Sequence, residues 1–241
     1  MNSSESHNFI LEEWLRSRRT VRISGLDLEP LPHPVLPDTP RCVMKGQASV
    51  YFFKQHPHGH MWLIKKFAPS RRPSDHHLLA VSRCIPGQAG FFTCTQRRIL
   101  QANHLDQRFS GFKHPELVRW IDGTILMPRV PGSPWISVAE TLCDNDFTFS
   151  WRQRLKIGSN LATCIALLES CDCSHRDLSS TNVFVTPEGD IYLIDWDCLY
   201  HPELEYEPNT TAGTNGYIAP FMRTTTGQWQ AQRSWCQHAD R

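Results

Sequence analysis

The segment of residues 175–197, HRDLSSTNVFVTPEGDIYLIDWD, constrains the fold of this chain more than any other part of the sequence. Two short apolar runs, at residues 183–185 and 191–194, are separated by Pro-Glu-Gly-Asp at residues 187–190. Proline, glycine and aspartate favour tight turns, and the flanking runs are long enough for short strands. The sequence therefore predicts a β-hairpin at this point.

Three side chains that carry oxygen border this hairpin. Asp177 and Asn182 stand in the loop before it, with four residues between them, and Asp195 ends its second strand. Phosphoryl transfer depends on positioning and on neutralising phosphate charge, so it needs oxygen ligands for hard cations and a carboxylate near the attacking oxygen. The alternative role is the capping of turns, which Asp and Asn both favour. The order of the three residues favours a site for a metal nucleotide.

The same segment resembles the catalytic core of eukaryotic-type protein kinases, in which H-R-D-L-x-x-x-N is followed by a D-F-G-like triplet. The resemblance implies an α+β, bilobal fold with an antiparallel β-rich N-lobe and a helical C-lobe. It implies ATP and Mg²⁺ as cofactors, with Asn182 and Asp195 holding the metal. It also implies Asp177 as the catalytic base that orients a Ser or Thr hydroxyl of a protein substrate.

The small lobe contributes further residues through the resemblance. WLIKKF resembles the strand whose lysine pairs with nucleotide phosphates, which aligns Lys65 with that lysine. Lys66 competes one position away, and the alternation of residues does not settle which lysine faces the site. Upstream, KGQASVY resembles the glycine-rich turn that covers the phosphates. Gly46 is retained there, Val50 takes the place that packs on the base, and Ala48 fills a usual glycine position.

Two more segments carry expected nucleotide contacts. Residues 127–130, MPRV, resemble the gatekeeper and hinge, so Met127 would stand beside the base and the backbone of Val130 would bond adenine. A predicted helix near residue 96 resembles the one that carries the glutamate partner of the strand lysine. Gln96 stands at that position without a charge, and Asp106 is the alternative partner if the helix is shifted.

The activation segment of the resemblance runs over residues 195–221. Its end, GTNGYIAPF, resembles G-T-x-x-Y-x-A-P-E, the substrate-docking turn of serine/threonine kinases. The match implies that Thr214 bonds the catalytic loop, and it places Phe221 where the family has glutamate. Asp197 replaces the glycine of the D-F-G triplet, which removes a flexible hinge.

Arg176 and Ser179 complete the catalytic loop. The resemblance gives Arg176 a role beside the base, and we expect it to pair with a phosphate on Thr210 or Thr211. Ser179 is a departure, because most serine/threonine kinases have a lysine there that steadies the transferring phosphate.

Three interpretations follow. The order of Lys65, Asp177, Asn182, Asp195 and Thr214 favours a serine/threonine protein kinase. The departures at Gln96, Ala48 and Phe221 favour a truncated or degenerate pseudokinase that binds a nucleotide or a partner without catalysis. DLSSTN with IDWD also resembles small-molecule phosphotransferases of the aminoglycoside and choline kinase type, although those enzymes lack the GTNGYIAP turn.

The rest of the chain is arranged around these motifs. Residues 8–19 predict a short amphipathic helix, and five prolines within residues 30–40 predict an extended linker. We expect residues 1–40 to form this helix and linker, residues 41–130 the kinase-like N-lobe, and residues 131–241 a partial C-lobe with the catalytic loop and activation segment. The C-lobe of the resemblance has further helices, so the chain is expected to be cut short before them.

Local patterns predict the elements inside these lobes. Two β-rich segments within residues 41–67 fit antiparallel strands. Residues 94–105 predict a helix, residues 114–123 and 124–130 predict two strands, and the apolar spacing of residues 149–168 predicts a long helix.

Composition excludes some functions. Lys+Arg 25 against Asp+Glu 24 leaves a net charge of +1, so no bulk field attracts nucleic acid or an anionic membrane. The first short apolar stretch, within MNSSESHNFILEEWL, contains acidic residues, and no run of about 18 apolar residues follows. We therefore expect neither a signal peptide nor a membrane span. We expect a cytoplasmic protein that binds neither nucleic acid nor membrane, and the sequence gives no oligomeric state.

The nine cysteines are expected to be free thiols, since most are scattered among apolar neighbours without a secretory signal. Cys171, Cys173 and His175 form C-x-C-x-H, which lacks the paired spacing of a structural zinc site.

Overall fold

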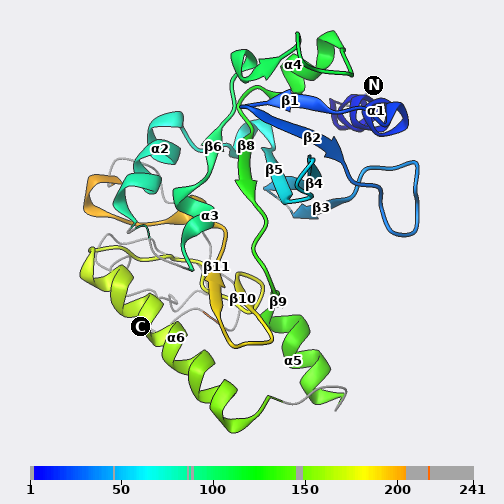
Figure 1. Cartoon of the computed structure of the whole chain (residues 1–241). Helices are drawn as coiled ribbons and strands as arrows, with labels where there is room; N and C mark the ends of the chain where they lie inside the picture. Colours follow the sequence, from blue (N-terminus) through cyan, green and yellow to red (C-terminus); the bar gives the residue numbers. More distant parts are fainter. Residues whose placement is uncertain are drawn as a thin grey trace, which may run out of the picture. The chain divides into compact units, whose positions relative to one another are not determined.

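A computed structural model describes residues 3–45, 47–85, 87, 90–144, 149–204 and 217 (Figure 1). The chain forms two compact units that interleave along the sequence. Unit 1 comprises Met1–Arg72 and Gln96–Arg129, and unit 2 comprises Pro73–Thr95 and Val130–Arg241. Residues 73–95, which lie inside the predicted N-lobe, therefore group with unit 2. The domain boundaries expected at residues 40 and 130 stay a prediction.

Unit 1 is built on an antiparallel sheet. Its described strands follow the order β6-β8-β5-β4-β2-β1-β7, with β3 paired to β4. The bounds are β1 Val21–Ile23, β2 Leu26–Pro30, β3 Cys42–Lys45, β4 Ala48–His56, β5 Met61–Phe67, β6 Arg98–Ile99, β7 Leu105–Asp106 and β8 Ile125–Pro128. The strands predicted within residues 41–67 and at the start of residues 124–130 are confirmed.

Local residue choice explains the first hairpin of this sheet. Ser24 and Gly25, between β1 and β2, have φ angles of 50° and 83°. A two-residue turn with positive φ at both positions matches the right-handed twist of the flanking strands. Strand β2 then runs as far as Pro30, and Pro32 forms an isolated bridge with Pro40. The proline-rich stretch thus begins inside the sheet, whereas its prolines predict an extended linker from residue 30.

The helix α1, Ser3–Ser17, packs against β2 and confirms the predicted N-terminal helix (Figure 1). Its Leu11 and Trp14 side chains are fully buried in the apolar core of unit 1. The Trp14 ring lies 5.2 Å from the Phe53 ring on β4, and its Nε1 donates a hydrogen bond to the Arg19 carbonyl at 2.8 Å. The helix is therefore an integral part of this core, because a large aromatic side chain gains most of its stabilisation from burial.

Two predicted elements of unit 1 are wrong. The strand predicted over residues 114–123 is the helix α4, Pro115–Ile121. Pro115 occupies its first turn, and the His114 side chain accepts a hydrogen bond from the Glu116 amide. Proline at the first helical position and a capping side chain before it are helix-start signals that outweigh the β-branched residues which follow.

The helix predicted over residues 94–105 is also wrong. In the structure α3 covers only Phe92–Thr95, and the chain then enters β6, which pairs with β8. Sheet pairing has overridden local helix preference here. Gln96 follows α3, so the helical register that made it a lysine partner does not exist.

Unit 2 holds the hairpin and most of the helices found in the described part of the chain. Its bounds are α2 Asp75–Cys84, α3 Phe92–Thr95, β9 Ser133–Pro134, α5 Trp135–Cys143, α6 Trp151–Ser170, β10 Val183–Val185 and β11 Ile191–Leu193. Two short 3₁₀ helices follow, η3 Trp196–Cys198 and η4 Pro202–Leu204. The described strands form the order β11-β10-β9. The predicted hairpin and the predicted long helix are both confirmed.

The structure therefore confirms an α+β fold with an antiparallel sheet. The bilobal kinase arrangement stays a prediction. Among the described residues, no helix combines the length and apolar character that a membrane span requires.

Packing around Gly132 fixes how the chain enters α5. Gly132 has a φ of +80°, and a Cβ at this position would overlap the Val185 carbonyl on β10. Strand β9 pairs with β10 at Ser133 and Val185 immediately afterwards. Glycine is required because both the dihedral angle and the close backbone approach exclude a side chain.

The place of α1 in the core can be tested by unfolding. We expect Trp14→Ala to lower the free energy of unfolding by about 3–5 kcal/mol, because it leaves a cavity among buried side chains. Phe9→Ala is the matched control on the same helix, since the Phe9 side chain is 54% exposed. Its cost should stay near about 0.5 kcal/mol. Urea denaturation followed by circular dichroism measures both, and equal losses would contradict the packing of α1.

Candidate active site

The loop before the hairpin is tied to the end of the hairpin by His175. This side chain is fully buried, its Nε2 lies 2.9 Å from the Ile194 carbonyl, and its ring packs 4.8 Å from that of Trp196. A bond to a carbonyl requires the proton on Nε2, so the neutral ring has a defined tautomer. The contact brings the start of the loop of residues 175–182 beside Ile194, the residue that precedes Asp195.

Asn182 closes the loop at its other end. Its Nδ2 donates to the Asp177 backbone carbonyl at 2.9 Å and to Asp177 Oδ2 at 2.8 Å. Asn182 is 2% exposed, and its backbone carbonyl accepts a hydrogen bond from the Ile194 amide at 3.0 Å. The amide therefore sets the direction of a half-buried carboxylate, because both of its donor hydrogens are used on Asp177.

The hairpin register brings Asp195 next to this pair. Val183 lies opposite Leu193, and Asn182 bonds to Ile194 through the backbone, so Asp195 is one residue beyond the partner of Asn182. The three residues singled out from the sequence thus gather at one end of β10 and β11. All three residues belong to unit 2.

Two backbone positions in this region are strained. Arg176 has a φ of 65° and Asp195 has a φ of 68°, both in the left-handed region that side chains other than glycine seldom adopt. Each such residue costs about 1–3 kcal/mol, and residues of this kind cluster at functional sites. These two residues change the direction of the backbone in the loop before the hairpin and directly after it.

Trp196 holds the chain after Asp195 in place. It is buried, its Nε1 donates to the Leu193 carbonyl at 3.1 Å and to Thr93 Oγ1 at 3.3 Å, and its ring meets that of Phe91 edge-on at 5.3 Å. The bulky apolar side chain that the sequence places after Asp195 is therefore an anchor on the α3 segment.

Sequence reasoning missed α2 and its contact with this segment. His77 on α2 is buried, and its Nε2 lies 2.9 Å from the Asp197 carbonyl. The available signal was Ser74-Asp75, because the Ser74 side chain caps the helix by accepting a hydrogen bond from the His77 amide. Histidines inside the first turn concealed an otherwise ordinary helix start.

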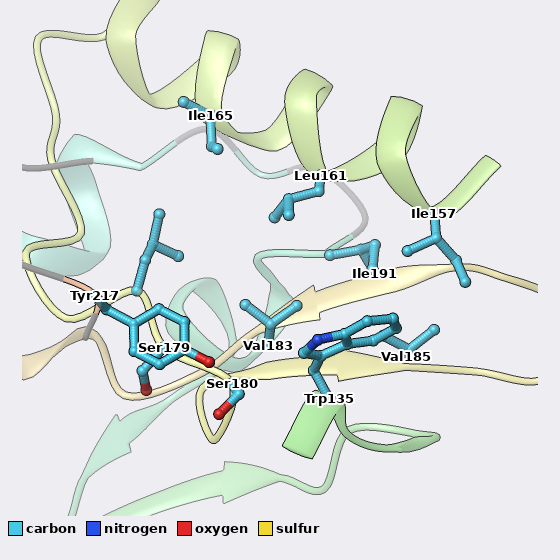
Figure 2. Close-up of a pocket in the computed structure, with 11 residues that line it drawn as sticks. Trp135, Ile157, Leu161, Ile165, Ser179, Ser180, Val183, Val185, Ile191 and Tyr217 are labelled. Carbon is cyan, nitrogen blue, oxygen red and sulfur yellow. The ribbon is translucent and has the colours of Figure 1, made fainter. Parts of the chain in front are cut away.

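Ser179, which stands where most serine/threonine kinases have a lysine, lies in the protein interior. Its side chain is buried, and its hydroxyl lies 3.0 Å from Thr181 Oγ1. Ser179 and Ser180 border a pocket of about 350 Å³ between α6 and the hairpin, which Figure 2 shows lined mainly by apolar side chains such as Leu161 and Val183. Asp177, Asn182 and Asp195 are not among the residues that line it.

In unit 1, the sheet register separates the two candidate lysines. Lys65 lies directly opposite Val50 on β4 and Ile125 on β8, and directly opposed residues share a face. Its Nζ lies 5.1 Å from the centre of the Phe67 ring. Lys65 therefore shares a face with Val50, one of the expected nucleotide contacts.

Lys66 faces the opposite side of the sheet. Its Nζ donates to the Trp120 carbonyl on α4 at 2.7 Å and lies 5.4 Å from the Trp120 ring. Burial lowers the pKa of the Lys66 ammonium, and the Asp122 carboxylate partly opposes this shift. Lys66 is thus used in packing α4 against the sheet.

The remaining expected residues are placed as follows. Met127, on β8 opposite Leu63, is half-buried, and Val130 is buried. Gly46 and Thr214 lie outside the described residues, as do Phe221 and the threonines expected to pair with Arg176. Lys65 belongs to unit 1 and Asp195 to unit 2, so their convergence on one nucleotide stays a prediction.

Comparison with known proteins gives partial matches. No model of a known protein family matches the chain. The serine/threonine-protein kinase STE20 of Saccharomyces cerevisiae is 31% identical over 118 residues, which cover 46% of this chain and 12% of STE20. A probable serine/threonine-protein kinase of Dictyostelium discoideum, mkcD, is 26% identical over 119 residues, covering 46% of this chain and 18% of mkcD.

A probable LIM domain-containing serine/threonine-protein kinase of Dictyostelium discoideum is 28% identical over 86 residues, covering 36% of this chain and 13% of the relative. The chain thus matches between 12% and 18% of the length of these relatives. These partial similarities support a loose relationship to serine/threonine kinases.

The face assignment of the two lysines can be tested by stability. We expect Lys66→Met to lower the free energy of unfolding by about 1.5–3 kcal/mol, because it removes a charged donor from a carbonyl at the α4 contact. Lys54→Met on β4 is the control, since Lys54 is exposed, and should change stability by less than about 0.5 kcal/mol. Denaturant titration measures the free energy of unfolding of both variants. An unfolding midpoint that does not change in Lys66→Met would mean that the Lys66 side chain lies in solvent.

The Asn182 amide makes a second prediction. Asn182→Asp replaces both donor hydrogens with a second carboxylate beside Asp177, and we expect a loss of about 1–3 kcal/mol near neutral pH. Mutual repulsion raises the folded-state pKa of the pair above the unfolded value, so this loss should shrink as pH falls through the raised pKa. Asn160→Asp, which removes a single hydrogen bond to the Gly189 carbonyl, is the control. Denaturation curves near pH 7 and near pH 4 compare them; a loss independent of pH would argue against the contact.

Proposed function

We propose that this chain binds a magnesium nucleotide and transfers its terminal phosphoryl group to serine or threonine hydroxyls of proteins. The observation that carries the proposal is the pair of hydrogen bonds from Asn182 Nδ2 to Asp177, in a hairpin that puts Asp195 one residue away from the cross-strand partner of Asn182. The partial similarity to named serine/threonine kinases gives independent support.

The donor set at this end of the hairpin fits a magnesium ion. Mg²⁺ prefers oxygen ligands and keeps several waters, so it needs few protein groups. The Asn182 Nδ2 is committed to Asp177, which leaves the oxygen end of the amide to accept; the hydroxyl of Thr181 lies 3.5 Å from it. Asp195 is half-buried and adds a carboxylate. When bound, magnesium would neutralise phosphate charge during transfer.

Within this proposal each residue has a limited task. Asp177 accepts the proton of the substrate hydroxyl, and Asn182 keeps the carboxylate aimed while contributing an oxygen to the metal. Asp195 supplies the second oxygen ligand. Arg176 stands between His175 and the base, and we assign it the recognition of a phosphate on the activation segment.

Unit 1 would provide the nucleotide contacts apart from Val130, which belongs to unit 2. Lys65 pairs with phosphate oxygens from the sheet face that it shares with Val50, which packs on the base. Gly46 closes over the phosphates, Met127 stands beside the base, and the Val130 backbone bonds adenine. Thr214 would brace the catalytic loop from the activation segment. These assignments follow the kinase resemblance together with the register of β4, β5 and β8.

A nucleotide-binding pseudokinase is the second candidate, and Ser179 favours it. In most serine/threonine kinases a lysine stands at this point, whereas the Ser179 side chain is buried and its hydroxyl lies beside that of Thr181. A basic group that steadies the departing phosphate would then be missing from the loop. Slow or absent transfer with intact nucleotide binding would result.

Nucleotide binding and transfer can be separated by variants. We expect Mg-ATP to raise the melting temperature, because a ligand that binds only the folded state stabilises it by about 2.7 kcal/mol at 100 times its Kd. Asp195→Asn and Lys65→Met should each raise the Kd for Mg-ATP at least about tenfold, which is a loss of about 1.4 kcal/mol in binding free energy. Both variants should therefore show a smaller rise in melting temperature. Lys54→Met should leave it unchanged. Folded protein without a Mg-ATP response would overturn the proposal.

Turnover is measured by transfer of labelled phosphate to a library of serine and threonine peptides. Asp177→Asn should keep the nucleotide response and lower the rate by about 10²–10⁴-fold, the usual contribution of a general base. Nucleotide binding without turnover in the unsubstituted protein supports the pseudokinase. Transfer to choline or an aminoglycoside but to no peptide supports a small-molecule kinase.

A further inference from the structure

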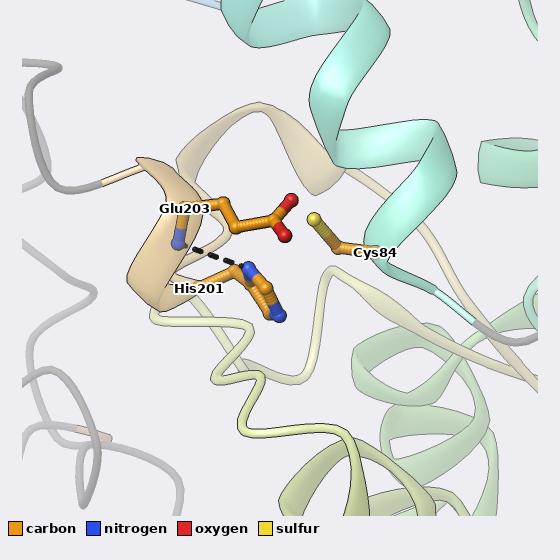
Figure 3. A group of neighbouring side chains, drawn as sticks. All are labelled: Cys84, His201 and Glu203. Carbon is orange, nitrogen blue, oxygen red and sulfur yellow. Dashed lines mark hydrogen bonds between the residues drawn. The ribbon is translucent and has the colours of Figure 1, made fainter.

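A group of three metal-binding side chains lies away from the hairpin end. Cys84 ends α2, and His201 and Glu203 lie at the start of η4 (Figure 3). Each offers one ligand atom, and these three atoms lie within 4.8 Å of one another. All three residues belong to unit 2. Among the residues that the structure describes, this is the group of histidine, cysteine and acidic side chains that meets such a spacing.

We propose that Cys84, His201 and Glu203 bind a zinc ion, with water in the fourth position. Zinc is bound at 2.0–2.3 Å by sulfur, nitrogen and oxygen ligands, so tetrahedral ligand atoms stand about 3.5 Å apart. The group therefore needs to close by at most about 1.3 Å. Glu203 is exposed, and its flexible side chain can make most of that movement.

The donor types select the metal. A thiolate and an imidazole are soft or intermediate ligands that favour zinc, whereas magnesium and calcium prefer oxygen alone. The site is thus chemically distinct from the oxygen-rich end of the hairpin. A cysteine thiolate and a glutamate carboxylate carry two negative charges together, which one divalent ion would balance.

A second cysteine lies close to the group but is engaged elsewhere. Cys173 donates its thiol hydrogen to the Cys84 carbonyl at 3.6 Å. Cys84 is therefore the cysteine whose sulfur lies with His201 and Glu203.

One ring nitrogen of His201 has an assigned role in the metal-free protein. The Glu203 backbone amide donates to His201 Nδ1 at 3.1 Å, which Figure 3 shows as a dashed line. This bond identifies Nδ1 as the nitrogen that carries a lone pair. Coordination at Nδ1 would replace this backbone hydrogen bond with a bond to zinc.

The position of the group along α2 gives the site a consequence. His77 and Cys84 are seven residues apart, two helical turns, so they lie on the same face of α2. His77 contacts the Asp197 carbonyl, and Cys84 meets His201 and Glu203, so the same face touches the chain at two points after Asp195. Zinc would fasten residues 197–203 to α2 at the second point. The inference does not depend on the proposed phosphoryl transfer.

Cobalt replaces zinc as a visible probe of thiolate coordination. We expect the whole chain, reduced and free of metal, to bind one Co²⁺ with a sulfur-to-cobalt absorption band and tetrahedral visible bands, both displaced by zinc but not by excess magnesium. Cys84→Ser should abolish the sulfur band, and Glu203→Gln and His201→Asn should weaken binding at least about tenfold. Cys143→Ser and Glu188→Gln, which change exposed residues of the same types, should leave it unchanged.

Glu203→Gln keeps the test valid if the cysteine variant unfolds, because Glu203 is exposed and circular dichroism can confirm its fold. No sulfur band in the unsubstituted protein, or a band that survives Cys84→Ser, would overturn the site. Hydrogen exchange tests whether zinc holds residues 197–203 against α2. Zinc should slow amide exchange in this segment, and unchanged exchange there would overturn this part of the proposal.

Discussion

The side-chain amide of Asn182 carries the geometry on which the candidate active site depends. It spends both donor hydrogens on Asp177, while the backbone of the same residue is bonded to Ile194 in the hairpin. One buried residue therefore fixes the direction of a carboxylate and the register of two strands. Leaving the donors of a buried amide without acceptors costs about 1–3 kcal/mol of stability, so the folded loop strongly favours this arrangement.

Stability and chemistry are divided among different parts of the chain. In unit 1 the helices α1 and α4 contribute to a continuous apolar core with the sheet, and Lys66 is used at the α4 contact. The other face of β5 keeps Lys65 in line with Val50. In unit 2 the core reaches the hairpin through Trp196, which anchors the strained residue before it. Backbone strain at Asp195 is thus offset by the burial of its neighbour.

The sequence was sufficient for features with local signals. The hairpin around Gly189, the capped helix α6 and the strands β4 and β5 have alternation, apolar spacing or turn residues that suffice without tertiary context. The lysine face could not be predicted, because Lys65 and Lys66 differ only in which side of the sheet α4 covers. Helix α4 was mistaken for a strand since its valine and isoleucine masked the Pro115 start signal. The helix predicted through Gln96 failed because pairing of β6 with β8 is a long-range contact.

A substitution at Gly132 would disturb the hairpin although Gly132 lies outside the candidate active site. Any side chain there would push the β9 backbone away from Val185, and β10, the strand that follows Asn182, would lose an edge partner. Trp135, two residues after β9 begins, lines the pocket that Ser179 and Ser180 border, and it would be displaced with β9. A variant at this glycine could thus resemble an active-site lesion in a genetic screen, although residue 132 carries no functional group.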